Sequence, residues 1–353
     1  MVYLGKKRVG DNNPVYIVFE AGPTHNSLDS AKELVRMAVE AGADAVKFQI
    51  LDPDRLVPDR KQVFSYDILI NRETEETKTV SEPLYDILKR RYLTFDEWRE
   101  LKAYSDSLGI EFFSTATFFD EVDFLVDLGS DTIKICSGDV NHFPLIRYCA
   151  KTGMAIQLDT GNSSIGEVEK AVDEVLKTDN SRIIIHNCPS GYPARLESIH
   201  LNIIPTLKQM FQVPVSFSDH TPGWEMDIAA VALGANMIEK TITMDRTIPS
   251  VEHIFSLEPD DMKKFVKSIR DLETALGSSR RKISEKEKSA GMGVRRSIIL
   301  ARGGKQGQSI AMEDLDFVRP GTGISPEMAD IISGKVFTRD IEKGEMLLWG
   351  DFA

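Results

Sequence analysis

Two lysines stand where the surrounding pattern does not explain a charge. Lys47 interrupts the apolar run "DAVKFQI", and Lys134 interrupts "DTIKICSG". Burying an ammonium group is costly unless the group has a partner or a task. Each lysine could simply pair with a neighbouring Asp or Glu. Two lysines that face one cavity would instead suit a small anion carrying both a carboxylate and a phosphate, because lysine offers a compact positive charge.

Polar residues also end nearly all of the remaining short apolar runs in the first 277 residues. One charged residue at such a position often only forms a structural salt bridge. Eight successive runs that all end in polar residues indicate a binding or catalytic site instead. Hydroxyl groups and exposed backbone N–H groups would add directional donors to the lysines. The residues at these ends are Glu20; Lys47 and Gln49; Thr115; Lys134, Ser137 and Asp139; Asp159 and Thr160; His186 to Ser190; Ser218 to His220; and Glu239 to Thr241.

A metal ion could also be held at these positions. His220, in "FSDHTPGW", is the best candidate ligand, because imidazole is the commonest ligand for divalent transition metals. A single histidine without other ligands nearby is more often a packed, hydrogen-bonded side chain than a metal ligand. Glu252 and His253, in "SVEHIF", follow the last run and are near enough in the chain to join His220. His25, in "GPTHN", could equally fix a loop.

Short apolar runs alternate with amphipathic segments from Val15 to Gly277, and this alternation predicts the elements that position the site. Eight runs, such as "VYIVFEAG", are each followed by a segment of helical period, such as "DSAKELVRMAVEAG". The pattern predicts a (β/α)8 TIM barrel, in which chemistry collects at the carboxyl ends of the strands. An open doubly wound sheet is the alternative, but no GxGxxG follows the first run.

Two stretches depart from the alternation. The segment from Asp52 to Thr94 is polar and too long for an ordinary loop, so we expect either a lid over the site or a disordered excursion. Residues 278–290, "SSRRKISEKEKSA", read as a charged linker. We therefore predict a catalytic barrel over residues 1–277 and a small β-rich domain over residues 291–353. So short a domain cannot build a large core, and we expect it to lean on a barrel, its own or a neighbour's.

Composition excludes several classes of function. The net charge of −12 argues against a broad nucleic-acid surface, which needs basic stripes. No apolar stretch approaches the roughly 20 residues that span a bilayer. Three cysteines, Cys136, Cys149 and Cys188, form no CxxC pair and read as reduced thiols. The first ten residues lack the apolar region of a signal peptide. We expect a cytoplasmic protein that binds neither nucleic acid nor membrane.

The ordered set of motifs resembles the sialic acid synthase family, which includes N-acetylneuraminate, legionaminate and pseudaminate synthases. The matching segments are "EAGPTHN", "KFQ", "FFSTATF", "IKICSGDVNHFPLI", "TGNSSI", "HNCPSGYPAR", "FSDHTPG", "IEK", "EHIFSLEP" and "FVRPGTGI". The last of these is similar to the antifreeze-like (SAF) domain of those enzymes. The resemblance implies condensation of phosphoenolpyruvate with an aldehyde sugar by a transferase of glycan biosynthesis.

The resemblance also implies roles for individual residues. Substrate binding falls to Lys47, Gln49, Thr115, Lys134, Ser137, Ser190, Tyr192 and Ser218, and proton transfer to Glu20, Asp139 and Glu252. Arg319 would reach the sugar from the SAF domain of a partner subunit, which implies a domain-swapped homodimer. His220 would bind a divalent ion, Mn²⁺ or Mg²⁺, that polarises the aldehyde as a Lewis acid.

Three residues depart from the family pattern. Thr241 replaces the second metal-binding histidine, Asp159 replaces a serine that faces phosphate, and Asp139 is one methylene shorter than the usual glutamate. Asp159, Glu252 or His253 could rebuild the metal site around His220. The metal could instead bind more weakly, with the lysines polarising the aldehyde. A third reading is a paralogue whose acceptor or activity has shifted. We favour an active synthase with a reorganised site.

Two alternatives compete with a synthase. One is a Schiff-base aldolase on the same barrel, with Lys134, Lys47 or Lys240 as the amine, because the fold hosts many chemistries. The other is a non-catalytic paralogue in glycan biosynthesis. The acceptor stays open between N-acetylmannosamine, a diacetamido-dideoxyhexose, and a phosphorylated or non-acetylated sugar.

Overall fold

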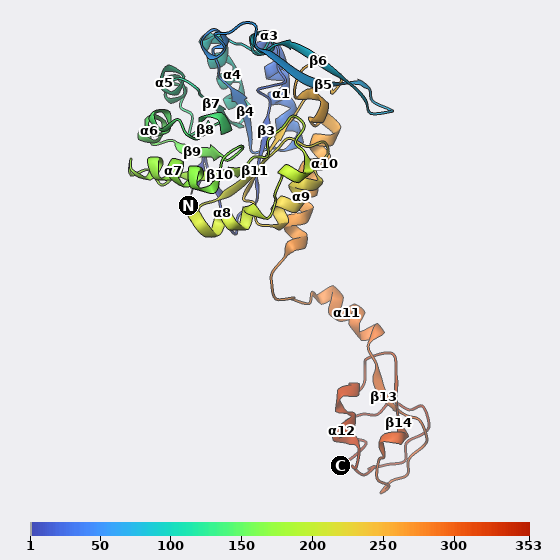
Figure 1. The fold of residues 1–353 in the computed structure, drawn as a ribbon. Coiled ribbons are helices and arrows are strands. Elements are labelled where there is room, and N and C mark those ends of the chain that lie inside the picture. The colour runs from blue at the N-terminus through green and yellow to red at the C-terminus, as the bar shows by residue number, and fades with distance from the viewer. Residues whose placement is uncertain (1) are drawn as a thin grey trace. The chain divides into compact units, whose positions relative to one another are not determined.

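The computed structural model describes residues 2–353 and divides into two units, residues 1–277 and 278–353. In the first unit, eight parallel strands close into a barrel in the order β10-β11-β12-β3-β4-β7-β8-β9 (Figure 1). The strands are β3 (Tyr16–Glu20), β4 (Ala45–Gln49), β7 (Glu111–Thr115), β8 (Thr132–Ile135), β9 (Ala155–Asp159), β10 (Ile183–Asn187), β11 (Val215–Asp219) and β12 (Met237–Thr241). The predicted TIM barrel is confirmed.

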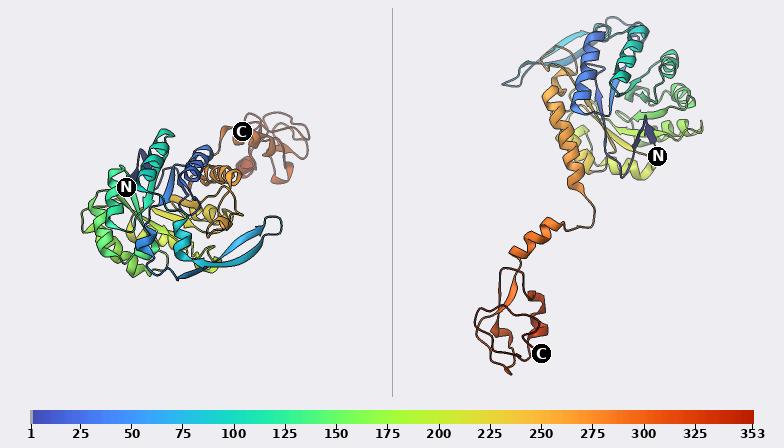
Figure 2. Two further views of the ribbon diagram at one scale, coloured as in Figure 1. Left: turned by 90° about the horizontal axis from the view of Figure 1, so that it is seen from above. Right: turned by 180° about the vertical axis from the view of Figure 1, so that it is seen from behind.

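Helices surround the barrel and bury their apolar faces against the outer side of the strands (Figure 2). Local sequence sets several helix ends: Ser27 and Ser30 form a capping box before α1, and Gly42 ends that helix in the left-handed conformation. The helices are α1 (Leu28–Ala41), α4 (Phe95–Ser107), α5 (Phe119–Asp127), α6 (Phe143–Lys151), α7 (Ile165–Leu176), α8 (Ile203–Phe211), α9 (Glu225–Ala232) and α10 (Pro259–Leu276).

The inside of the barrel is layered. At the amino ends of the strands the inner side chains are mostly apolar, and the hairpin of β1 (Val2–Leu4) and β2 (Lys7–Val9) packs on them. This floor comprises Val2, Leu4, Val9, Tyr16, Val18, Ala45, Phe113, Ala155, Ile184 and Met237. One step further along each strand, the inner positions become polar or charged. The alternation of side chains along a strand therefore brings the expected site residues together inside the barrel.

The segment between β4 and α4 is folded. It contains α2 (Pro53–Leu56), a hairpin of β5 (Val63–Asn71) and β6 (Glu76–Pro83), and α3 (Leu84–Lys89). Leu69 packs with Ile254 and Phe255 of the loop after β12. Arg72 forms ion pairs with Asp245 at 2.5 Å and with Glu258 at 2.6 Å. Of the two interpretations of this segment, the structure favours an ordered covering element at the carboxyl end of the barrel.

The second unit has its own small core. After α11 (Glu285–Val294), β13 (Ser297–Leu300) pairs with β14 (Leu315–Val318), and α12 (Ala329–Ile332) follows. Ile298, Leu300, Ile332 and Phe337 are among its buried residues. The linker region is helical from Glu285 because Ser284 and Glu287 form a capping box.

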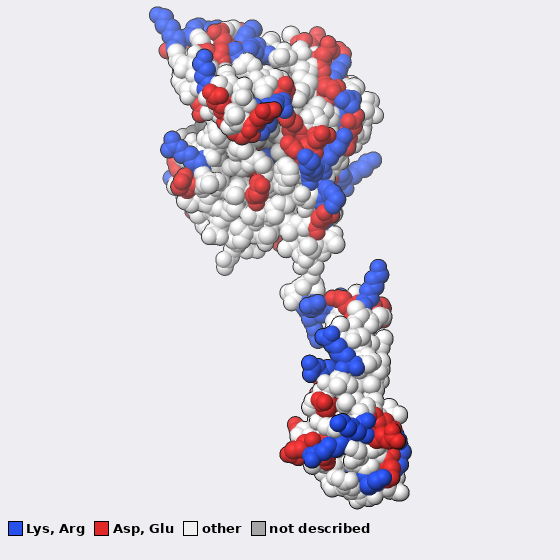
Figure 3. All heavy atoms as spheres, turned by 90° about the vertical axis from the view of Figure 1, so that its right-hand side faces the viewer, with Lys and Arg blue, Asp and Glu red and all other residues white. Residues whose placement is uncertain are grey.

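The surface carries both signs of charge. On the face drawn in Figure 3, acidic and basic side chains lie side by side rather than in stripes of one sign. In the described part of the chain, no helix combines the length and the hydropathy that crossing a membrane requires.

Candidate active site

Lys47 and Lys134 meet at one carboxylate oxygen in the middle of the barrel. Nζ of Lys47 lies 2.9 Å from Oε1 of Glu239, and Nζ of Lys134 lies 2.7 Å from the same atom. Ser218 donates a hydrogen bond of 2.9 Å to that oxygen, while Oε2 of Glu239 is buried with no hydrogen-bond partner among the described residues. The two lysines therefore converge inside the barrel, and both are ion-paired to carboxylates, as the first of the two expectations for them had it.

Burial opposes the charge on Glu239 and on Lys134, and the charged partners of each group outweigh that effect. Burial alone would raise the pKa of Glu239, but Lys134 and Lys47 hold that pKa well below its ordinary value. Burial would lower the pKa of Lys134, and Asp159 and Glu239 raise it above its ordinary value instead. A protonated amine is a poor nucleophile, so this environment disfavours Lys134 as a Schiff-base lysine.

Two further carboxylates extend the network. Glu20, at the end of β3, is ion-paired to Lys47, and Gln49 Nε2 lies 3.5 Å from Glu20 Oε2. On the other side, Asp159 Oδ1 lies 3.0 Å from Lys134 Nζ. Burial raises the pKa of Asp159, although Lys134 acts in the opposite direction. Two ammonium groups thus face three carboxyl groups, and a proton on Asp159 would balance the charge.

Lys240 does not face the site. Its position next to Glu239 on β12 turns it to the outer side of the barrel, where it is ion-paired to Asp219 and lies 3.5 Å from Asp227. It also donates a 2.6 Å hydrogen bond to the carbonyl of Thr221. Lys240 as the amine of a Schiff-base enzyme is therefore wrong: the residue fixes α9 to the barrel.

Glu252, in the loop after β12, and Arg91, just after α3, add two charged groups to this network. Burial raises the pKa of Glu252 to about 7, against the opposing charges of Arg91 and Lys47. A carboxyl group with that pKa can donate or accept a proton near neutral pH. Arg91 follows α3 in the covering segment, and no strand end or motif marked it. Only its position in a charged segment that covers the site could have drawn attention to it.

His220 directly follows β11 and Thr241 ends the neighbouring strand β12, so the pairing of Asp219 with Lys240 brings the two residues side by side. The ring of His220 packs against Tyr192, with centroids 4.8 Å apart, and its Nδ1 lies 3.3 Å from the carbonyl of Pro189. Burial lowers the pKa of His220 to about 4, which leaves the imidazole neutral. Tyr192 lines the mouth of the barrel with its ring and is 43% exposed.

The side chains do not assemble a divalent metal centre. Among residues 2–353, no group of three His, Cys, Asp or Glu side chains is placed to hold an ion. His253 Nδ1 is 2.7 Å from Thr243 Oγ1, and Asp159 is bound to Lys134, so neither joins His220. The donors therefore do not fit the expected Mn²⁺ or Mg²⁺ site, and we derive no step through a metal.

The remaining expected residues lie around the rim. Thr115 pairs with Gln49 and Lys134 in the register of the sheet and is buried. Ser190 Oγ donates to Asn162 Oδ1 at 2.9 Å, which joins the loops after β10 and β9.

Ser137 and Asp139 form a short 3-10 turn after β8. Burial raises the pKa of Asp139. Arg319, in the second unit, is exposed just after β14.

Comparison with known proteins agrees with this picture. Residues 34–281 match the NeuB family, and residues 295–353 match the SAF domain. The chain is 39% identical to N,N'-diacetyllegionaminic acid synthase of Legionella pneumophila, over 98% of this chain and 96% of that protein. It is 31% identical to human N-acetylneuraminate-9-phosphate synthase, over 96% and 93%. A solved N-acetylneuraminic acid synthetase of Leptospira borgpetersenii superposes with a TM-score of 0.70 and 29% identity, covering 82% of this chain and 94% of that one.

Proposed function

This chain belongs to the NeuB family, an enzyme family of sialic acid synthase type, and from that premise we propose that it condenses phosphoenolpyruvate with an aldehyde sugar. The product is a nonulosonic acid, and inorganic phosphate is released. The observation that carries the proposal is the convergence of Lys47, Lys134 and Ser218 on one carboxylate oxygen. These three groups already bind the carboxylate of Glu239. A carboxylate is also one of the two anionic groups of phosphoenolpyruvate, so the same three groups suit that substrate.

The same residues suit the chemistry of the condensation. C3 of phosphoenolpyruvate attacks the aldehyde carbon and forms the new C–C bond. Glu252, protonated in part near neutral pH, gives a proton to the aldehyde oxygen as it becomes a hydroxyl group. Such general acid catalysis contributes about 10²–10⁴-fold. Lys47 and Lys134 hold the donor's carboxylate beside the cation that develops at C2.

Water then completes the reaction. It adds to C2 and loses a proton to Glu20, which is held against Lys47. In the tetrahedral intermediate the bond between C2 and the phosphate oxygen breaks while the C2 hydroxyl gives its proton to the leaving phosphate, and a 2-keto acid remains. We assign phosphate binding to the side of the site formed by β9 to β11, where Ser218 inside the barrel and Ser190 on the loop after β10 supply hydroxyl groups.

The assembly is part of the proposal. Arg319 is exposed in the second unit, and we assign it to the acceptor site of a partner subunit in a domain-swapped homodimer.

A panel of aldehyde sugars tests the function. The protein is incubated with phosphoenolpyruvate, with and without Mn²⁺, and with each sugar in neutral and 6-phosphorylated form, while phosphoenolpyruvate consumption and the keto-acid product are followed. Consumption that requires a sugar and yields a nonulosonic acid supports the proposal. A covalent adduct with a keto acid trapped by borohydride would contradict it.

A further inference from the structure

A cavity of about 190 Å³ lies beside the candidate active site, between the loop after β3 and the residues that follow α3. Its polar lining includes His25, Arg90, Arg91, Ser250 and His253, and no carboxyl side chain of residues 2–353 lines it. Liquid water occupies about 30 Å³ per molecule, so the cavity holds about six waters. That space suits a single oxyanion with some water.

Arg91 has no partner for its guanidinium. Its side chain forms no hydrogen bond or ion pair with any described residue, and its Nε atom is buried. Burial lowers the pKa of Arg91, against the opposing charge of Glu252. The neighbouring Arg90 is different, because Glu82 binds both of its terminal nitrogens at 2.6 and 2.7 Å. A guanidinium left unpaired in this way is costly and is suited to bind an anion.

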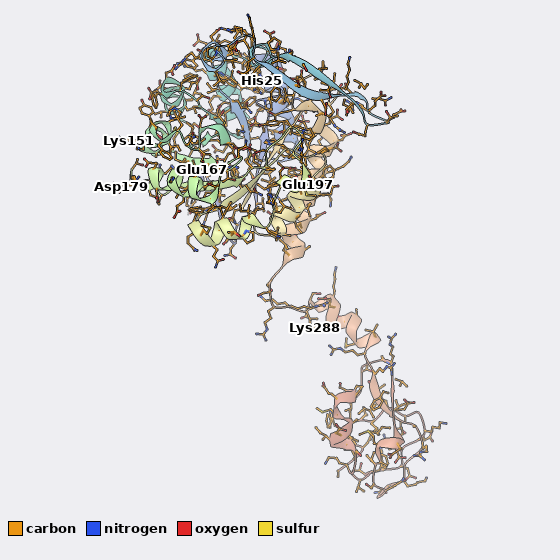
Figure 4. All side chains as sticks on the ribbon, in the orientation of Figure 1. His25, Lys151, Glu167, Asp179, Glu197 and Lys288 are labelled. Atoms are coloured by element: carbon orange, nitrogen blue, oxygen red, sulfur yellow. The ribbon has the colours of Figure 1, made fainter. Side chains whose placement is uncertain are left out.

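His25 is a second unpartnered group in the cavity wall. It is 3% exposed, and neither ring nitrogen has a hydrogen-bond partner within residues 2–353. Edge contacts with Phe48 and Trp98, at centroid distances of 5.6 and 5.8 Å, fix the ring. Burial lowers the pKa of His25 to about 3, so the neutral ring offers one N–H donor. Figure 4 shows His25 at the end of the barrel near α3.

We propose that this cavity binds an oxyanion on the acceptor sugar, at the end of the sugar remote from its aldehyde. The inference rests on the proposed function. Glu252 directly precedes His253, which lines the cavity together with Arg91, so an acceptor whose aldehyde meets Glu252 extends toward Arg91. Arg91 could serve only to offset the charge of Glu252, but the two side chains form no ion pair, and Nε of Arg91 has no partner among the described residues.

The anion site can be measured without knowing the acceptor. Protein saturated with phosphoenolpyruvate is titrated with inorganic sulfate by calorimetry, as wild type, Arg91→Gln and Lys89→Gln. Lys89 is the charge-matched control, because it is exposed at the end of α3 and does not line the cavity. We expect sulfate to bind to wild type and Lys89→Gln and to bind roughly tenfold or more weakly to Arg91→Gln. Equal binding to all three proteins would overturn the site.

The sugar panel identifies the kind of anionic acceptor. The inference expects the sugar with the highest kcat/KM to be acidic, and expects Arg91→Gln to lose that preference while Lys89→Gln keeps it. A neutral sugar preferred equally by all three proteins would overturn the inference alone. Absence of any heat on adding phosphoenolpyruvate, with no consumption of it, would overturn the proposed function itself.

Discussion

Lys134 and Glu239 form the central ion pair of the barrel, with Nζ 2.7 Å from Oε1 and both side chains buried. These two residues face each other across the barrel, and Lys47 joins the same oxygen from β4, two strands away from β12. A buried carboxylate oxygen shared by two ammonium groups orders the site before any substrate arrives. It also means that an anionic donor must compete with carboxylates that are already in place.

Lys134→Met should therefore destabilise the fold as well as abolish donor binding. It leaves Glu239 and Asp159 buried without their shared partner, and breaking a buried pair costs about 3–5 kcal/mol of unfolding free energy. The pKa of Glu239 lies below its ordinary value, so this contribution is present above the ordinary carboxyl pKa and is lost as the pH falls. Urea unfolding at neutral and acidic pH measures the difference. Lys151→Met, at an exposed position in α6, is the control.

Glu252→Gln should change how stability depends on pH. The pKa of Glu252 is raised from 4.5 to about 7, so the unfolded chain loses this proton first and the native state loses stability as the pH rises from 4.5 to 7. The variant should match wild type near pH 4 and exceed it by on the order of 3 kcal/mol above pH 7. Glu121 has a pKa of about 7 as well, but it is present in both proteins and cancels. A gap that does not widen with pH would contradict the assignment.

Asp159→Ser should improve donor binding. The Asp159 carboxylate lies 3.0 Å from the Lys134 ammonium and competes with an anionic ligand for it. Because burial raises the pKa of Asp159, the competition is strongest at high pH, where the carboxyl group is ionised. We expect the KM for phosphoenolpyruvate to fall about tenfold at pH 8 and less at pH 6. Steady-state kinetics of both proteins at pH 8 and pH 6 measure these KM values. A higher KM in the variant would show that Asp159 helps to hold phosphoenolpyruvate.

Much of this site follows from the sequence by alternation along the strands. Once the apolar runs are taken as barrel strands, Lys47, Lys134 and Ser218 must point inward and meet. Because side chains alternate along a strand, Lys240 points outward when its neighbour Glu239 points inward. The prediction that Lys240 could be an active-site amine overlooked this alternation.

Two features could not be derived in that way. The position of Arg91 depends on how a long, covering segment folds back on the barrel, and no periodic pattern specifies that path. The sharing of Glu239 by both lysines depends on distances between opposite walls, which one strand does not reveal.

Thr241→His should create a metal site. Thr241 and His220 end adjacent strands on the inner face, and Glu252 lies close to Thr241, so a second imidazole would complete three donors. We expect Mn²⁺ to bind the variant at least roughly tenfold more tightly than wild type, by calorimetry. Thr206→His, at an exposed position in α8, controls for an added imidazole. No gain in affinity would show that the two strand ends do not converge on one ion.

Co-expression of Lys134→Met with Arg319→Ala tests the swapped dimer. Each variant alone should be inactive, because one lacks the donor-binding lysine and the other lacks the exposed arginine assigned to the acceptor. In a mixed dimer with sites completed in trans, one barrel keeps its own Lys134 and receives Arg319 from the other subunit, so activity should return. If each chain completed its own site, every barrel in the mixed dimer would still carry a lesion and activity would stay absent. Differently tagged chains, purified through both tags and assayed for phosphoenolpyruvate consumption, separate the two arrangements.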